Sequence, residues 1–266
     1  MNRNEAIELV GKITAGWPKL VQRIDRLQEE EKCAPSCVAI GVDQSLLLGR
    51  MESTFADLLA AAEVIYAAPG LTLTLTLTLE PKLHHAELLH KLRRERRYAS
   101  YSPAETWAHL GRLYGAGQGA ALSRRQAATS LVVIMGLHRP ANTKFTPAGV
   151  VVDVYWLAPK CPFRKKLRPS GFGPDPIESI ATLLRAILFT TGQMDDSTVK
   201  DIDGIIAKAR ESNQKGFDSR DVAGGPHLSI KLFSNKVQWR LSAPVAQTIQ
   251  LFTSEHAEQF AAIEVQ

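Results

Sequence analysis

The sequence predicts an α+β fold in which a strand–helix–helix segment lies between an N-terminal helical segment and a C-terminal α+β domain. The first observation is residues 71–79, which alternate leucine and threonine without interruption. A period of two is typical of a β-strand, because successive side chains point to opposite faces. The second observation is that apolar residues recur at helical spacing on both sides of this strand, and that strand-like segments return after residue 148.

The alternating segment predicts a strand with two chemically different faces. Leucine occupies every odd position of residues 71–79 and would form one apolar face. Threonine occupies the even positions Thr72, Thr74, Thr76 and Thr78. Threonine is β-branched, which favours the strand conformation. Such a strand needs a partner, because its unpaired backbone groups otherwise bind other strands.

Two helices are predicted after this strand. Residues 82–97 form the first, with Leu83, Ala86, Leu89 and Leu92 at helical spacing. The second has three start signals, namely Ser102 as the N-cap, Pro103 at the first helical position and Glu105 three residues after the cap. Its apolar stripe consists of Trp107, Leu110, Leu113 and Tyr114.

This order of elements resembles the ribbon-helix-helix family of DNA-binding proteins. Residues 77–83, Leu-Thr-Leu-Glu-Pro-Lys-Leu, look like the strand-to-helix junction of that family, and residues 102–105, Ser-Pro-Ala-Glu, resemble the start of its second helix. The resemblance covers residues 71–117. It implies a homodimer in which the strands of two chains pair as an antiparallel ribbon in the DNA major groove. Family ribbons usually carry some longer polar or basic side chains, whereas all four positions here are threonine.

The resemblance also implies a set of DNA-contacting residues. The four threonines would face the bases, since a threonine hydroxyl donates or accepts a hydrogen bond and its methyl group contacts the thymine methyl. Backbone N–H groups at Ser102 and Ala104 would bind a phosphate. Non-specific phosphate contacts would come from Lys91, Arg93, Arg94, Arg96 and Arg97. No catalytic residue, metal or cofactor is expected.

The wider architecture suggests a transcriptional regulator. The predicted protein, a large ribbon-helix-helix protein with flanking domains, resembles the AcaB-type activators of conjugative plasmids. This resemblance rests on architecture alone. Charge agrees with a DNA partner: the chain carries a net charge of +5, and residues 71–125 hold nine basic and four acidic residues. A local basic excess attracts a polyanion such as double-stranded DNA.

Cysteine content and hydropathy predict a cytoplasmic protein with no membrane partner. The three cysteines, Cys33, Cys37 and Cys161, are an odd number in a long chain, which argues against a disulfide framework. The N-terminus lacks a signal-peptide pattern. No apolar run approaches the roughly 18 residues that a membrane-spanning helix needs.

The remaining segments complete three predicted regions, residues 1–68, 69–138 and 148–266. Residues 4–31, broken at residues 16–18, and residues 45–67 are predicted helices that pack on each other or on the strand–helix–helix segment, and residues 123–138 form a supporting helix. Residues 140–147 are predicted to be a linker and residues 213–226 to be flexible. The C-terminal domain is predicted to contain a strand at 150–157, a hairpin at 227–241, and helices at 176–190, 197–212 and 243–263. A further protein partner would bind through this domain.

Two alternatives remain open. Residues 71–79 can instead be one strand of an ordinary sheet that pairs with residues 150–157, in an accessory protein of a mobile element that binds protein partners. The other alternative is a metal-dependent nucleic-acid-processing enzyme that uses Asp175, Glu178, Asp195 or Asp196. The sequence contains no Walker loop, dinucleotide fingerprint, zinc-protease helix or nucleophile elbow.

Overall fold

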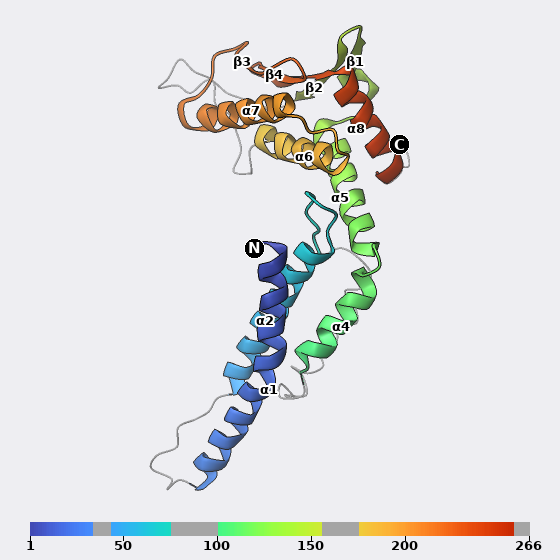
Figure 1. The fold of residues 1–266 in the computed structure, drawn as a ribbon. Coiled ribbons are helices and arrows are strands. Elements are labelled where there is room, and N and C mark those ends of the chain that lie inside the picture. Colours follow the sequence, from blue (N-terminus) through green and yellow to red (C-terminus); the bar gives the residue numbers. More distant parts are fainter. Residues whose placement is uncertain (34–43, 76–100, 156–175, 258–266) are drawn as a thin grey trace, which may run out of the picture. The chain divides into compact units, whose positions relative to one another are not determined.

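A computed structural model describes residues 1–33, 44–75, 101–155 and 176–257 (Figure 1). Within them the chain forms seven α-helices and one five-stranded antiparallel sheet, which confirms the predicted α+β class. The chain divides into two compact units. The first unit comprises Met1–Ala67 and Thr72–Ala120, and the second comprises Ala68–Leu71 and Ala121–Gln266.

The first unit is built around three packed helices, α1 (Arg3–Cys33), α2 (Gln44–Tyr66) and α4 (Pro103–Tyr114). The helices of the N-terminal segment therefore pack with the second helix of the strand–helix–helix segment, as predicted. The predicted break at residues 16–18 is wrong, because α1 continues through Pro18. Proline removes one backbone donor from a helix, but Trp17 beside it is buried in the core, and this packing holds the helix together.

Two apolar clusters form the core of the first unit. One surrounds Trp17 and Tyr101 and joins α1 to the residue that precedes the α4 cap. The other lies at Leu58 and Leu110, and its alanines allow α1 and α2 to approach closely. Ala6, Ala61 and Ala62 are the fully buried alanines of this second cluster.

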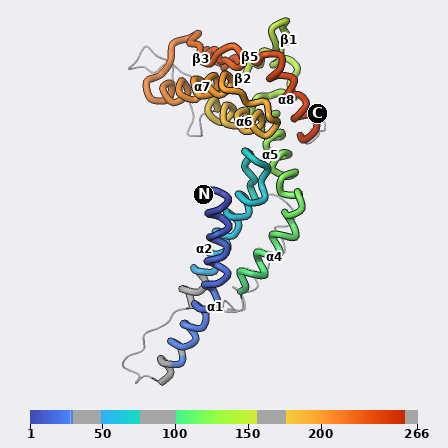
Figure 2. The backbone as a smooth tube through the Cα atoms, viewed as in Figure 1, coloured from blue at the N-terminus to red at the C-terminus, as the bar shows by residue number. Residues whose placement is uncertain are grey.

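The second unit is an antiparallel sheet with helices on one side (Figure 2). The strand order is β1-β2-β5-β4-β3. The strands are β1 (Thr143–Thr146), β2 (Gly149–Tyr155), β3 (Val222–Gly224), β4 (Leu228–Leu232) and β5 (Lys236–Ser242). The helices are α5 (Gln118–Met135), α6 (Pro176–Thr190), α7 (Asp196–Lys215) and α8 (Ala243–His256), and a 3-10 turn η2 (Pro140–Asn142) precedes β1.

The strand register separates an inner face from an outer face of this sheet. Val152 lies opposite Trp239, which lies opposite Ile230, and all three side chains are fully buried. Helices α7 and α8 contact the strands, and α6 packs on both helices. In each strand, the residues immediately before and after these three point to the outer face, away from the helices.

Two segments form strands that the sequence did not indicate. The predicted linker at residues 140–147 contains β1, and the predicted flexible segment at residues 213–226 contains β3. Both strands lie at the edges of the sheet and have mostly exposed side chains. They therefore lack the buried apolar alternation from which a strand is recognised in a sequence.

Candidate nucleic-acid interface

The leucine–threonine segment begins at a short turn that is fixed within the second unit. The Ala68 N–H donates to the Ser123 hydroxyl at 2.9 Å, and the Thr190 hydroxyl donates to the Pro69 carbonyl at 2.7 Å. Gly70 adopts a φ of 80° between these anchors and lies against the Phe189 ring. These two hydrogen bonds and the contact of Gly70 with Phe189 thus fix the backbone from which the leucine–threonine segment begins.

Residues 72–75 show the predicted alternation of faces but not the predicted strand. Leu73 is buried, whereas Thr72 and Thr74 are exposed. Residues 71–75 form no strand pairing, and residues 76–79 lie outside the described part of the chain. The Leu75 N–H instead donates to the Glu63 carboxylate of α2 at 2.8 Å. The Leu75 side chain packs on the apolar cluster that contains Leu110, and Trp107 packs on the same cluster.

The alternative pairing with residues 150–157 is not present in the described segments. Strand β2 pairs with β5 along its whole length on one side and with β1 over residues 149–152 on the other. None of residues 71–75 takes part in this sheet. The described part of the leucine–threonine segment is therefore not one of its strands.

The N-terminus of α4 has the predicted cap. The Ser102 hydroxyl accepts a hydrogen bond from the Glu105 N–H at 3.2 Å, and Pro103 occupies the first turn. The Ala104 N–H has no intrahelical acceptor because it lies in the first turn, and Ala104 is exposed. An anion can therefore reach this helix end, where the backbone dipoles favour negative charge.

A shallow depression of about 400 Å³ opens beside this helix end. Trp17 and Tyr101 line it together with Ser102 and Ala104. The Trp17 indole nitrogen and the Tyr101 hydroxyl are buried without a hydrogen bond in the described residues. Burial raises the pKa of Tyr101, and the Thr106 hydroxyl beside it opposes this rise without reaching hydrogen-bond geometry. The two aromatic rings contact each other and lie beside the start of α4.

Several predicted contact residues fall outside the described part of the chain. They are Thr76, Thr78, Lys91, Arg93, Arg94, Arg96 and Arg97, with the whole predicted helix at residues 82–97. Of the predicted set, the structure describes Thr72, Thr74, Ser102 and Ala104, and all four belong to the first unit.

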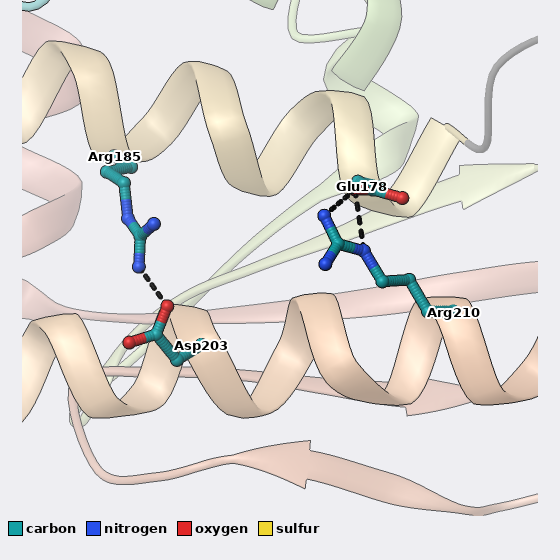
Figure 3. A network of polar contacts seen from close by, with 4 residues as sticks. All are labelled: Glu178, Arg185, Asp203 and Arg210. Carbon is teal, nitrogen blue, oxygen red and sulfur yellow. Dashed lines mark hydrogen bonds and ion pairs between the residues drawn. The ribbon is translucent and has the colours of Figure 1, made fainter.

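Two of the four carboxylates of the metal-dependent alternative, Glu178 and Asp195, have other roles, and Asp196 is exposed in the first turn of α7. Glu178 on α6 accepts two hydrogen bonds from Arg210 of α7, at 3.0 and 2.6 Å (Figure 3). Asp195 caps α7 by accepting the Thr198 N–H at 2.7 Å. Asp175 lies outside the described residues. Across the described ranges, no group of three or more His, Cys, Asp or Glu side chains is placed to hold a metal ion.

Comparisons with known proteins identify no relative. No protein-family model, curated protein or solved structure matches this chain significantly. Among the described helices, none combines the length and apolar character that crossing a membrane requires.

One concentration of basic side chains was not predicted from the sequence. Lys231, Lys236 and Arg240 of the hairpin, together with Lys144 of β1, share the outer face of the sheet. The signal was present in the alternation of the two hairpin strands, where a basic or polar residue occupies every second position. The pairing with β1, which places Lys144 there, was not expected.

Proposed function

We propose that this protein is a sequence-specific DNA-binding transcriptional regulator, active in the cytoplasm as a homodimer. Residues 71–79 of two chains pair as an antiparallel ribbon and enter the major groove. Thr72, Thr74, Thr76 and Thr78 contact base edges. The capped end of the second helix, at Ser102 and Ala104, holds the ribbon against a phosphate.

The observation that carries this proposal is the alternating exposure of residues 71–74. Leu71 and Leu73 are buried while Thr72 and Thr74 are exposed, yet among the described residues these four form no strand pairing. A segment with an apolar inner face and a uniform polar outer face, outside the five-stranded sheet, is suited to pairing with a second copy. A two-stranded ribbon is also narrow enough for the major groove.

The polar outer face suits base contact better than a solvent face of ordinary composition. Threonine has a short side chain that loses little rotational freedom when it is fixed. Its hydroxyl and methyl groups match the mixed pattern of acceptors, donors and thymine methyl groups in the major groove. The arginine-rich residues 91–97, which precede α4 in the sequence, would supply the sequence-independent attraction.

Selection from a pool of random duplexes tests the proposal. The full-length protein is expected to enrich one family of sites with two related half-sites, bound by two chains, in buffer without divalent metal. A threonine-free ribbon variant, with Thr72, Thr74, Thr76 and Thr78 all changed to Ala, is expected to enrich nothing. Failure of the unmodified protein to enrich any sequence would refute sequence-specific binding.

A further inference from the structure

The outer face of the C-terminal sheet carries three cross-strand rows of side chains. The first row contains Val151, Arg240 and Ser229, and the second contains Asp153, Gln238 and Lys231. In the third row Tyr155 pairs with Lys236, and Phe233 follows β4 on the far side of Lys236. The helices that contact the sheet cover its other face, where Val152, Trp239 and Ile230 are buried.

Positive charge dominates this outer face. Among the described residues, Lys144, Lys231, Lys236 and Arg240 lie on it with a single acidic residue, Asp153. Asp153 is already engaged, since Lys236 donates to it at 2.8 Å and Gln238 donates at 3.1 Å. Lys144 and Arg240 form no ion pair within the described residues. A solvent-facing sheet surface is ordinarily polar, and charges of both signs on it would pair with one another. An excess of one sign instead attracts an external ligand of the opposite sign.

Aromatic rings stand among these cations. Tyr155 is 61% exposed at the end of β2. The Phe233 ring lies near two ammonium groups, with its centroid 5.5 Å from Lys236 Nζ and 5.7 Å from Lys231 Nζ. Exposed rings beside cations are the elements from which proteins bind unpaired bases, by stacking on the base and neutralising the adjoining phosphate.

We infer that this outer sheet face is a binding surface for single-stranded nucleic acid. The polyanion matches the charge, and unpaired bases match the exposed ring of Tyr155. Duplex DNA fits less well, because five strands spaced about 4.8 Å apart are wider than the roughly 12 Å major groove and the bases of a duplex are already stacked. The inference is independent of the ribbon proposal, since all the residues involved belong to the second unit.

Binding of a fluorescent 12-nucleotide oligo(dT) to the full-length protein tests this inference. Tyr155→Ala is expected to weaken binding about fivefold or more, whereas Tyr155→Phe keeps the stacking ring and should bind nearly as well as the unmodified protein. The double variant Lys231→Ala/Arg240→Ala should lower affinity and reduce the slope of log affinity against log salt by about 1.4, at roughly 0.7 for each lost phosphate contact. Lys200→Ala/Lys215→Ala, two exposed lysines of α7, is the charge-matched control and should change neither.

Three results would overturn the inference. One is oligo(dT) affinity that is unchanged in both Tyr155→Ala and the outer-face double variant while circular dichroism shows both to be folded. A second is tighter binding of a 12-base-pair duplex than of oligo(dT), lost in the same variants. The third is equal affinity for polyglutamate of the same charge, which would make the face a general polyanion surface. A failure of the ribbon proposal would be seen separately, as a loss of preference for one duplex sequence with oligo(dT) affinity unchanged.

Discussion

The indole ring of Trp17 meets the ring of Tyr101 edge to face, with centroids 5.2 Å apart and ring planes at 86°. Trp17 lies in the middle of α1, and Tyr101 immediately precedes the Ser102 cap of α4. Edge-to-face geometry matches the positive edge of one ring to the negative face of the other. This contact therefore fixes where α4 begins, and with it the helix end that we propose to contact a phosphate.

Tyr101→Phe is expected to leave the free energy of unfolding unchanged or slightly higher. The Tyr101 hydroxyl is buried without a hydrogen bond in the described residues, so its removal relieves an uncompensated polar group. Tyr101→Ala should instead cost about 3–5 kcal/mol, because it removes a buried aromatic ring. Chemical denaturation measures both. A loss of about 2 kcal/mol in Tyr101→Phe would show that the hydroxyl has a partner in the native protein.

Glu63→Ala is expected to loosen the start of the ribbon segment. The Glu63 carboxylate accepts the Leu75 N–H at 2.8 Å, and a hydrogen bond to a charged group contributes about 1.5–3 kcal/mol. Amide hydrogen exchange at Leu75 should therefore accelerate about 10- to 100-fold. Glu63→Gln keeps an acceptor oxygen and should accelerate exchange much less. Equal exchange in all three proteins would mean that this bond does not hold the segment.

Gly70→Ala is expected to destabilise the second unit more than Gly192→Ala. Both glycines have positive φ, at 80° and 71°, so alanine is strained by about 1–2 kcal/mol at either position. At Gly70 the added Cβ would also lie 2.5 Å from the Phe189 ring, whereas at Gly192 it would meet nothing within 4 Å. Overpacking should add about 1–3 kcal/mol at Gly70 alone. Equal melting temperatures for the two variants would contradict the close packing of this turn.

Asp153 is expected to make stability fall in acid. Burial raises the pKa of Asp153, but hydrogen bonds from Lys236 and Gln238 and the charges of Lys236 and Lys144 outweigh it, so the pKa lies below the ordinary 3.8. A lowered pKa in the folded protein adds stability above pH 4 that is lost as pH falls through the folded-state pKa. Asp153→Asn should lower the free energy of unfolding by about 1.5–3 kcal/mol at pH 7. It should also make that free energy depend less on pH below about pH 4.

A partly exposed carboxylate, Glu178, provides the control for Asp153. Glu178 pairs with Arg210 across α6 and α7, and the Arg210 side chain is 65% exposed. Pairs of this kind contribute about 1 kcal/mol or less. Glu178→Gln should therefore change stability at pH 7 less than Asp153→Asn does. The reverse order, measured by denaturation at pH 7, would show that the Asp153 pair is not the stronger of the two.

Local signals predicted much of the fold. The serine, proline and glutamate at residues 102, 103 and 105 predicted the start of α4, and the observed cap uses the same Ser102 hydroxyl and Glu105 N–H. Ser234 and Asn235 predicted the turn between β4 and β5. In each case the residues that carry the signal also form the bond or turn, so no distant contact is needed.

Features that depend on distant contacts were not predictable from local signals. Pro18 indicated a helix break, and only the burial of Trp17 in the core explains why α1 continues. Strand β1 exists because β2 offers it a paired edge, and Lys144 joins the outer face through that pairing. The strand predicted at residues 71–79 is a comparable case, since residues 71–75 have the alternation but form no strand pairing among the described residues.

The most direct test of the ribbon proposal compares specific and random duplex affinity in Thr74→Ala/Thr76→Ala. Alanine has a lower strand propensity than threonine, by about 1 kcal/mol or less per site, and the leucine face is untouched, so the fold and dimer should survive. Thr143→Ala/Thr146→Ala, which changes two threonines of β1 in the second unit, is the matched control. Affinity for the selected duplex should fall by about 1–3 kcal/mol for each lost base contact, while random-duplex affinity barely moves. If the ratio of specific to random affinity stays constant in the ribbon variant, the threonines do not contact bases and the ribbon proposal is wrong.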